Sequence, residues 1–175
     1  MEKYCELEMY EIGRMEMALE ILKENKNVFF PPPVTEKEID ECYDDLKAFA
    51  MLHPLPKDLI NFLKRHNGFK WNSIEIFGAD KIYEIGNSFD QKLMDIFSIN
   101  RKLFKGNSVL NKLNTKEKTL EYLCFGNSAE NYFVYNEKND TWEIHSMTIG
   151  ETLRTYDSFP AFFASEIGCV IGKNE

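Results

Sequence analysis

The segment that decides the fold runs from Leu55 to Asp80 and reads LPKDLINFLKRHNGFKWNSIEIFGAD. Pro56 suits the first turn of a helix, because proline fixes its own φ angle and lacks an amide that would be unpaired there. The side chains of one face then recur at three- and four-residue steps, at Leu59, Phe62, Leu63 and His66. This spacing predicts a short amphipathic helix that begins at or just after Pro56.

The same segment predicts where this helix ends and a strand begins. The Asn67-Gly68 pair stops the helix, since glycine readily adopts the left-handed backbone conformation that closes helices. Ile74 and Ile76 alternate with polar residues, and the Phe77-Gly78 pair follows them. This alternation indicates a strand and its exit.

The composition sets the class of protein. The chain has 175 residues, of which 43% are hydrophobic and 14% aromatic, so we expect a single globular domain with ample material for a core. No apolar run approaches the roughly 20 residues that a membrane helix needs. The first residues, MEKYCELEMYEIGR, have neither the basic start nor the apolar middle of a secretion signal. We therefore expect a cytoplasmic protein without membrane contact.

The net charge of −8 lies at one end of the chain. Residues 1–46 carry thirteen acids and five bases, and the remaining residues carry sixteen of each. Such a balance argues against direct nucleic-acid binding, which needs lysine and arginine to displace counterions from phosphates. It fits a basic protein partner better. The plainer alternative is that the charge serves solubility.

A second helix is predicted from Thr35 to Ala50. Thr35 and Glu38 form a capping box, three residues apart. The residues expected on its buried side are Ile39, Cys42 or Tyr43, Leu46 and Phe49. The opposite side is crowded with acids, at Asp40, Glu41, Asp44 and Asp45. An acidic surface attracts a basic protein electrostatically. We therefore predict that these four acids contact the partner.

The first 33 residues form a segment of their own. An amphipathic pattern predicts a helix from Lys3 to Lys23, with a buried stripe at Ile12, Met15, Leu19 and Leu22. Residues 29–33, Phe-Phe-Pro-Pro-Pro, then make an extended connector. The favoured interpretation is that this helix docks on its own core, in the domain of residues 34–175. The alternative is an arm that docks on another molecule.

The rest of the chain predicts an α+β fold. A helix should start at Ser88 or Asp90 and run to about Leu103, and strands are expected over residues 120–125, 131–135 and 141–146. A hairpin turn joins the last two. A final helix follows from Phe159, and Gly168 should close it. We expect a largely antiparallel sheet, packed by the N-terminal helices and closed by the C-terminal helix.

Catalytic and metal-binding motifs are missing from the sequence. Neither a phosphate-binding Gly-x-x-x-x-Gly-Lys-Ser/Thr loop nor a His-Glu-x-x-His string is present. The histidines, His53, His66 and His145, are scattered, and we expect His66 to cap its own helix through the last carbonyls. The cysteines, Cys5, Cys42, Cys124 and Cys169, are predicted to be buried free thiols. We therefore expect a non-catalytic protein without metal or cofactor.

The order of these features resembles the SUKH superfamily. The resemblance rests on Leu55-Pro56, the short helix, Asn67-Gly68 and the strand ending in Phe77-Gly78. The acidic helix and a later run containing FGNSAENYFVY, TWEI and YDSFPAFF agree with it. This superfamily joins fungal regulators of cell-wall glucan synthesis to bacterial immunity proteins that neutralise toxins.

The resemblance implies a protein that works by binding. The leading hypothesis is a cytoplasmic immunity-type protein that sequesters a toxin domain, such as a basic nuclease or nucleotide-modifying enzyme; the alternative is a regulatory scaffold for signalling or envelope-synthesis proteins. In addition to the acids of this helix, the candidate contacts with the partner are Trp71, Glu130, Asn131, Tyr132 and Tyr135. Glu130 and Asn131 lie in the segment Ser128-Ala129-Glu130-Asn131. This chain differs here from many relatives, which carry a glycine-rich turn with an aspartate at this place.

Overall fold

The computed structural model describes residues 2–49, 54–79, 83–84, 92–105 and 121–171. Its helices are α1 (Glu2–Glu24), α2 (Glu36–Phe49), α3 (Lys57–His66), α4 (Ile96–Lys105) and α6 (Phe159–Ile171). Its strands are β1 (Val28–Phe29), β2 (Phe69–Trp71), β3 (Ile74–Ile76), β4 (Tyr83–Glu84), β5 (Lys92–Leu93), β6 (Tyr122–Asn127), β7 (Asn131–Asn136), β8 (Thr141–Ser146) and β9 (Thr152–Tyr156).

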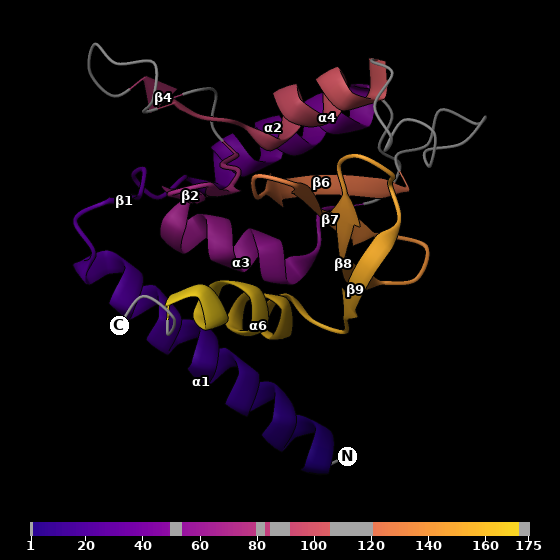
Figure 1. Ribbon diagram of the computed structural model, residues 1–175. Coiled ribbons are helices and arrows are strands. Elements are labelled where there is room, and N and C mark those ends of the chain that lie inside the picture. Colours follow the sequence, from indigo (N-terminus) through magenta and orange to yellow (C-terminus); the bar gives the residue numbers. More distant parts are fainter. Residues whose placement is uncertain (1, 50–53, 80–82, 85–91, 106–120, 172–175) are drawn as a thin grey trace.

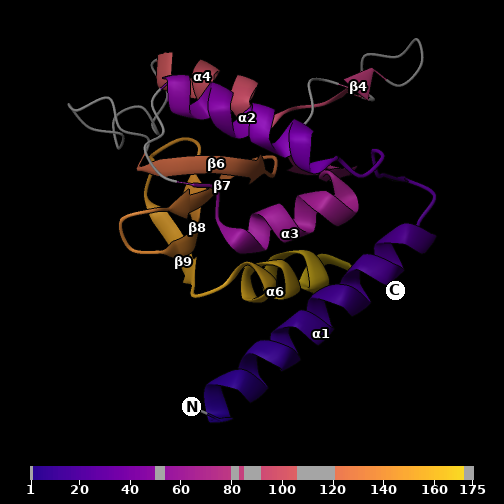
Figure 2. The same cartoon turned by 180° about the vertical axis from the view of Figure 1, so that it is seen from behind.

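The main sheet is antiparallel and lies between two layers of helices. Its strand order is β1-β2-β3-β6-β7-β8-β9, and β4 pairs separately with β5. Helices α2 and α4 cover one face of the sheet, while α3 and α6 cover the other (Figures 1 and 2). The predicted α+β class with a largely antiparallel sheet is confirmed.

Aromatic rings form the core between the sheet and α6. Ring centroids lie 5.1 Å apart for Phe62 and Phe159, 5.1 Å apart for Phe125 and Phe162, and 5.0 Å apart for Trp142 and Phe159. Each of these five side chains is at most 3% exposed. Tilted and edge-on pairs of this kind add to the stabilisation from burial alone. The final helix thus joins α3 to the sheet.

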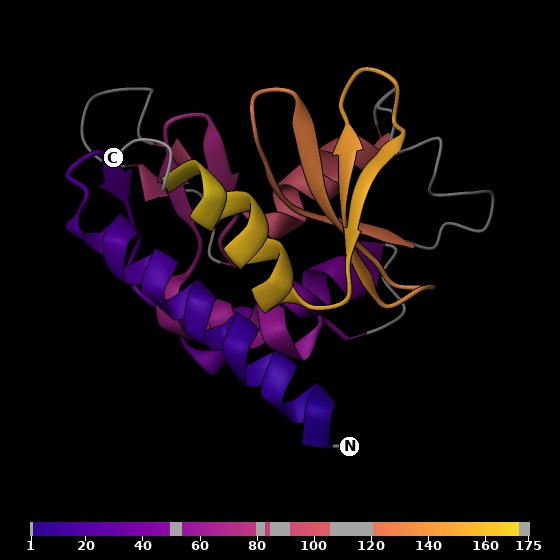
Figure 3. The ribbon, with the colours of Figure 1, turned by 60° about the horizontal axis from the view of Figure 1, so that its bottom comes forward.

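Helix α1 packs on the core of its own chain and runs beside α6 (Figure 3). Its buried side chains are Met15, Ala18, Leu19 and Leu22. Polar contacts flank this stripe: Arg65 pairs with Glu16 at 2.5 Å, and the Ser158 hydroxyl donates to Glu11 at 2.9 Å. The predicted stripe was one turn too long, because Ile12 is 39% exposed.

The predicted starts of α2 and α3 agree with the structure. The Glu38 carboxylate accepts hydrogen bonds of 2.7 Å from both the backbone N–H and the hydroxyl of Thr35, which completes the capping box. Pro56 is the N-cap residue of α3. At the other end of α3, Asn67 is already left-handed, with φ 42°, and Gly68 follows with φ 81°. The Asn67-Gly68 pair therefore ends the helix as predicted, and Asn67 is the first left-handed residue.

Two predicted boundaries were wrong, and one strand was not predicted. Helix α4 begins only at Ile96, later than the predicted start at Ser88 or Asp90, which lies outside the described residues. Helix α6 continues through Gly168 to Ile171, and Gly168 faces α1, where a Cβ atom would lie 3.9 Å from the Cβ of Ala18. Strand β9 was missed because Thr152 to Thr155 are all exposed and lack the apolar alternation of a half-buried strand.

Candidate functional site

The outer side of α2 carries the acids that the sequence singled out. Asp40, Glu41 and Asp44 are exposed and Asp45 is half-buried. Lys37 pairs with Glu41 at 3.3 Å, and both side chains are mostly exposed. Of the lysines and arginines that the structure describes, none forms an ion pair with the other three acids. We call Asp40, Glu41, Asp44 and Asp45 the acidic face.

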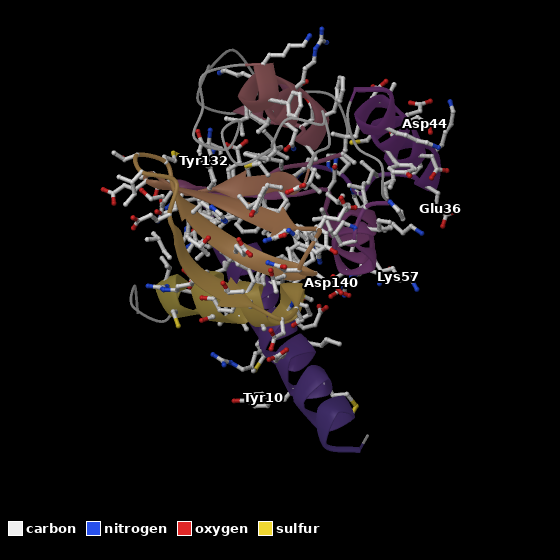
Figure 4. The ribbon with its side chains drawn as sticks, turned by 90° about the vertical axis from the view of Figure 1, so that its right-hand side faces the viewer. Tyr10, Glu36, Asp44, Lys57, Tyr132 and Asp140 are labelled. Carbon is white, nitrogen blue, oxygen red and sulfur yellow. The ribbon has the colours of Figure 1, made fainter. Side chains whose placement is uncertain are left out.

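Part of the acidic face points away from the body of the molecule. Figure 4 shows Glu36 and Asp44 on the outer side of α2. Near the start of the helix, Lys64 of α3 donates to Glu36 at 2.5 Å, and this hydrogen bond lowers the pKa of the Glu36 carboxyl. The contact links the first turn of α2 to α3.

A small pocket of about 70 Å³ lies beside the acidic face, between α2 and α4. Its lining consists of Glu38, Glu41, Cys42, Asp45, Ala79, Asp95 and Phe97. We call it the α2–α4 pocket. Two residues of the acidic face, Glu41 and Asp45, therefore also form part of this pocket.

Asp95 is the pocket residue that the sequence did not indicate. It is only 1% exposed. Its Oδ1 accepts a hydrogen bond of 2.7 Å from the backbone N–H of Ser98, which caps α4. Its Oδ2 is buried and has no hydrogen-bond partner. A buried carboxylate oxygen without a donor is costly, which makes it the most unusual polar atom of this region.

Cys42 contributes a neutral group to the same pocket. Burial, followed by the nearby carboxylates of Asp95 and Asp45, raises the pKa of its thiol to about 12. The thiol therefore stays protonated near neutral pH and is a poor nucleophile.

The aromatic candidates do not form one surface with the acidic face. Trp71 is 3% exposed and belongs to the core, so the prediction that it anchors a partner is not supported by its position. Tyr135 is 8% exposed, and its hydroxyl donates to Asp140 at 2.6 Å. Tyr132 is half-buried, and since the side chains of a strand alternate, it lies on the sheet face opposite to Tyr135.

The turn between β6 and β7 is held by backbone hydrogen bonds. The N–H of Ser128 donates to the carbonyl of Asn131 at 2.8 Å, and the N–H of Met147 donates to the carbonyl of Glu130 at 2.9 Å. The Glu130 side chain is exposed and that of Asn131 half-buried. Figure 4 shows Tyr132 on the opposite side of the view from Asp44. The predicted contacts are thus divided between two separate surfaces.

A buried polar cluster on β8 was missed by the sequence reasoning. Glu143 and His145 are 5% and 2% exposed, and their two-residue spacing on a strand places them on one face. His145 Nε2 lies 2.6 Å from Glu143 Oε2, and Nδ1 lies 3.3 Å from the carbonyl of Gly150. Because a carbonyl only accepts, Nδ1 donates to Gly150, and Nε2 faces the Glu143 carboxyl group.

This cluster satisfies its own hydrogen bonds. The remaining carboxylate oxygen of Glu143 accepts from the Asn136 amide and from the Thr141 hydroxyl, both at 2.9 Å. Fully satisfied buried networks stabilise one packing arrangement. We therefore assign Glu143 and His145 of β8 a structural role.

The expectation that His66 caps its own helix is wrong. His66 is 8% exposed and packs against the rings of Phe30 and Phe62, with centroids 5.9 Å and 5.3 Å away. Its Nε2 has no hydrogen-bond partner. Burial, assisted by Lys23 and Arg65, lowers the pKa of the imidazole to about 4. The ring is therefore a neutral core group near neutral pH.

The cysteine prediction holds only in part. Cys42 and Cys124 are buried and free, but Cys169 is free and exposed. The side chain of Cys5 and all of His53 lie outside the described residues. In the described ranges, no group of three or more His, Cys, Asp or Glu side chains is arranged to hold a metal ion. The helices of these ranges include none long and apolar enough to cross a membrane.

Comparison with known proteins identifies the family. The model of the SMI1 / KNR4 family (SUKH-1) matches residues 33–165, from just before α2 into α6. Neither the curated proteins nor the solved structures compared with the chain contain a match. The matched range includes the acidic face and the α2–α4 pocket. The chain belongs to the SMI1 / KNR4 family (SUKH-1).

Proposed function

We propose that this protein is a non-catalytic immunity-type domain that binds and neutralises a toxin domain with a basic active-site cleft. The observation that carries the proposal is the acidic face of α2, where Asp40, Asp44 and Asp45 have no basic partner among the described residues. The family also includes regulators of glucan synthesis, so the proposal rests on this surface and not on family membership alone.

The acidic face has the properties that such binding needs. A toxin that acts on nucleic acid or nucleotides presents cationic side chains in its cleft, and a carboxylate surface can occupy that cleft in place of the phosphates. Opposite charges of this kind mainly raise the association rate, and they do so less as salt screens them. The acids lie on a helix whose start is fixed by its capping box and by the Lys64–Glu36 contact.

The immunity function predicts that a toxin domain is encoded beside this gene, and the test uses that domain. The chain is expressed with it, and growth rescue is measured together with association kinetics at several salt concentrations. The test variant replaces Asp40, Glu41, Asp44 and Asp45 by the neutral amides. We expect its association rate constant at low salt to fall by about tenfold or more, with a weaker salt dependence.

A matched control removes the same number of negative charges at other places in the chain. It replaces Glu24, Glu121, Glu151 and Asp157 by their amides; these acids have no side-chain hydrogen bond or ion pair among those described. We expect the control to keep rescue and most of the association rate. Equal effects of the two variants would show that only net charge matters, and would contradict a role for the acidic face. Absence of rescue by the unaltered chain would contradict the immunity function and favour the regulatory scaffold.

A further inference from the structure

All the charged side chains that line the α2–α4 pocket are acidic. Its polar groups are four carboxylates and the neutral Cys42 thiol, and its apolar walls are Ala79 and Phe97. Carboxylates only accept hydrogen bonds when they are ionised. A group that fills this pocket must therefore supply donors, and a positively charged group suits it best.

Two of the four carboxylates are already engaged. Glu38 accepts from Thr35, and Glu41 pairs with Lys37. Asp45 and the Oδ2 of Asp95 have no described partner, and Asp95 is 99% buried. Leaving such an acceptor without a donor costs free energy. Because Asp95 lines the pocket, a donor that enters the pocket is brought next to this residue.

The pocket is small but can admit a cationic group. Its volume of about 70 Å³ is several times the roughly 10–15 Å³ that one water molecule needs, so a small head group such as an ammonium can enter. The methylene next to that ammonium would find apolar walls in Phe97 and Ala79. A guanidinium is larger and is recognised best by a planar pair of acceptors. An ammonium instead has three donors that rotate freely, which suits carboxylates arriving from two helices.

We propose that the α2–α4 pocket binds the ammonium group of a lysine side chain from the protein partner. This inference rests on the proposed function, because it specifies a contact within the same binding surface. Asp95 Oδ2 and Asp45 accept from the ammonium, and the acidic face around the pocket holds the flanking cationic surface. The lysine thus anchors the partner at one end of α2.

The pocket is tested without the partner, with n-butylammonium chloride as the probe. Backbone amide shifts are followed by two-dimensional NMR during a titration at constant ionic strength, with sodium chloride as the reference salt. We expect saturable shifts at Ala79 and Phe97 with n-butylammonium and none with sodium chloride. Asp95→Asn keeps the Oδ1 acceptor that caps α4 and should fold. We expect this variant to bind the probe at least tenfold more weakly.

Asp40→Asn is the matched control, since Asp40 lies on the same helix outside the pocket lining. We expect it to bind n-butylammonium within about twofold of the unaltered chain. Equal weakening by both variants, or shifts that sodium chloride reproduces, would overturn the pocket assignment. Tighter binding of guanidinium than of n-butylammonium would overturn the lysine assignment. Failure here leaves the association kinetics of the acidic face unaffected, so the two proposals fail separately.

Discussion

Asn67 and Ala79 join the end of α3 to the segment that leaves β3. The Asn67 Oδ1 accepts a hydrogen bond of 2.9 Å from the backbone N–H of Ala79. Gly78 lies against the same side chain, since a Cβ atom there would come within 2.7 Å of Asn67 Oδ1. The Asn67-Gly68 and Phe77-Gly78 pairs, ten residues apart in the chain, are therefore the two sides of one contact.

The first prediction concerns Gly68. A Cβ atom there would lie 2.3 Å from the carbonyl oxygen of Ile76, and the residue has φ 81°. Because both the backbone conformation and the space exclude a side chain, Gly68→Ala should lower the free energy of unfolding by at least about 3 kcal/mol. Gly13→Ala is the control, in an open helical position, and should raise it by about 0.5–1 kcal/mol. Urea denaturation measures both; a Gly68→Ala loss below about 1 kcal/mol contradicts the argument.

The second prediction separates the two roles of Asn67. Asn67→Ala removes the acceptor of the Ala79 N–H and forces alanine into a left-handed conformation, so we expect a loss of about 2–4 kcal/mol. Asn67→Gly removes only the acceptor and should be about 1 kcal/mol less harmful. Guanidinium denaturation compares the two variants. Equal losses would mean that the left-handed backbone at this position carries no cost.

The third prediction concerns Asn100 of α4, which is 2% exposed. Its amide donates to the Cys124 carbonyl at 2.7 Å, and its Oδ1 accepts from the Cys124 N–H at 2.9 Å. Asn100 thus pairs with β6 as a neighbouring strand would. Asn100→Asp replaces the donor by an oxygen that faces the carbonyl, and should cost about 2–4 kcal/mol in unfolding free energy. A loss under about 0.5 kcal/mol by thermal or urea denaturation would show that α4 is held without this contact.

The fourth prediction concerns the pH dependence of stability. The pKa of His66 falls from 6.5 to about 4 on folding, so between these values the unfolded chain binds more protons. Stability should therefore be full above about pH 6.5 and decline as the pH falls toward 4, by a total of about 3 kcal/mol from this group.

His66→Phe tests this, because a phenyl ring suits the contacts with Phe30 and Phe62 and does not titrate. Burial raises the pKa of Glu75, so that group acts in the opposite direction, favouring the folded state as it becomes protonated. Both chains contain Glu75, and the difference between them isolates His66. Between pH 7 and pH 4.5 the denaturation midpoint of the unaltered chain should fall relative to that of His66→Phe; parallel curves would contradict the assignment.

The fifth prediction is that the pocket residue Asp95 lowers stability in the free protein. Asp95→Asn keeps the cap on α4 and removes a buried carboxylate oxygen that has no donor, so it should raise the unfolding free energy by about 0.5–1 kcal/mol. Asp95→Ala removes the cap as well and should lower it by about 1 kcal/mol. Calorimetry distinguishes these signs. A destabilised Asp95→Asn variant would mean that the carboxylate is already satisfied in the free protein.

Local signals in the sequence predicted much of the fold. The capping box of Thr35 and Glu38, the Asn67-Gly68 stop and the alternation in β8 depend on residues close together in the chain, so their physical effects can be read without a tertiary structure. Strands β1 and β9 carried no such signal. Their residues are half-buried or exposed, and only pairing with a neighbouring strand makes them strands.

In the candidate site, too, some features follow from the sequence and others only from the tertiary structure. The sequence by itself determined the acidic face, because four acids on one helix follow from the helical period alone. The tertiary structure decided that Trp71 is buried, that Tyr132 and Tyr135 lie on opposite sheet faces, and that Asp95 meets Asp45 in a pocket. Asp45 and Asp95 are fifty residues apart, and only the packing of α4 beside α2 brings the two residues into one pocket.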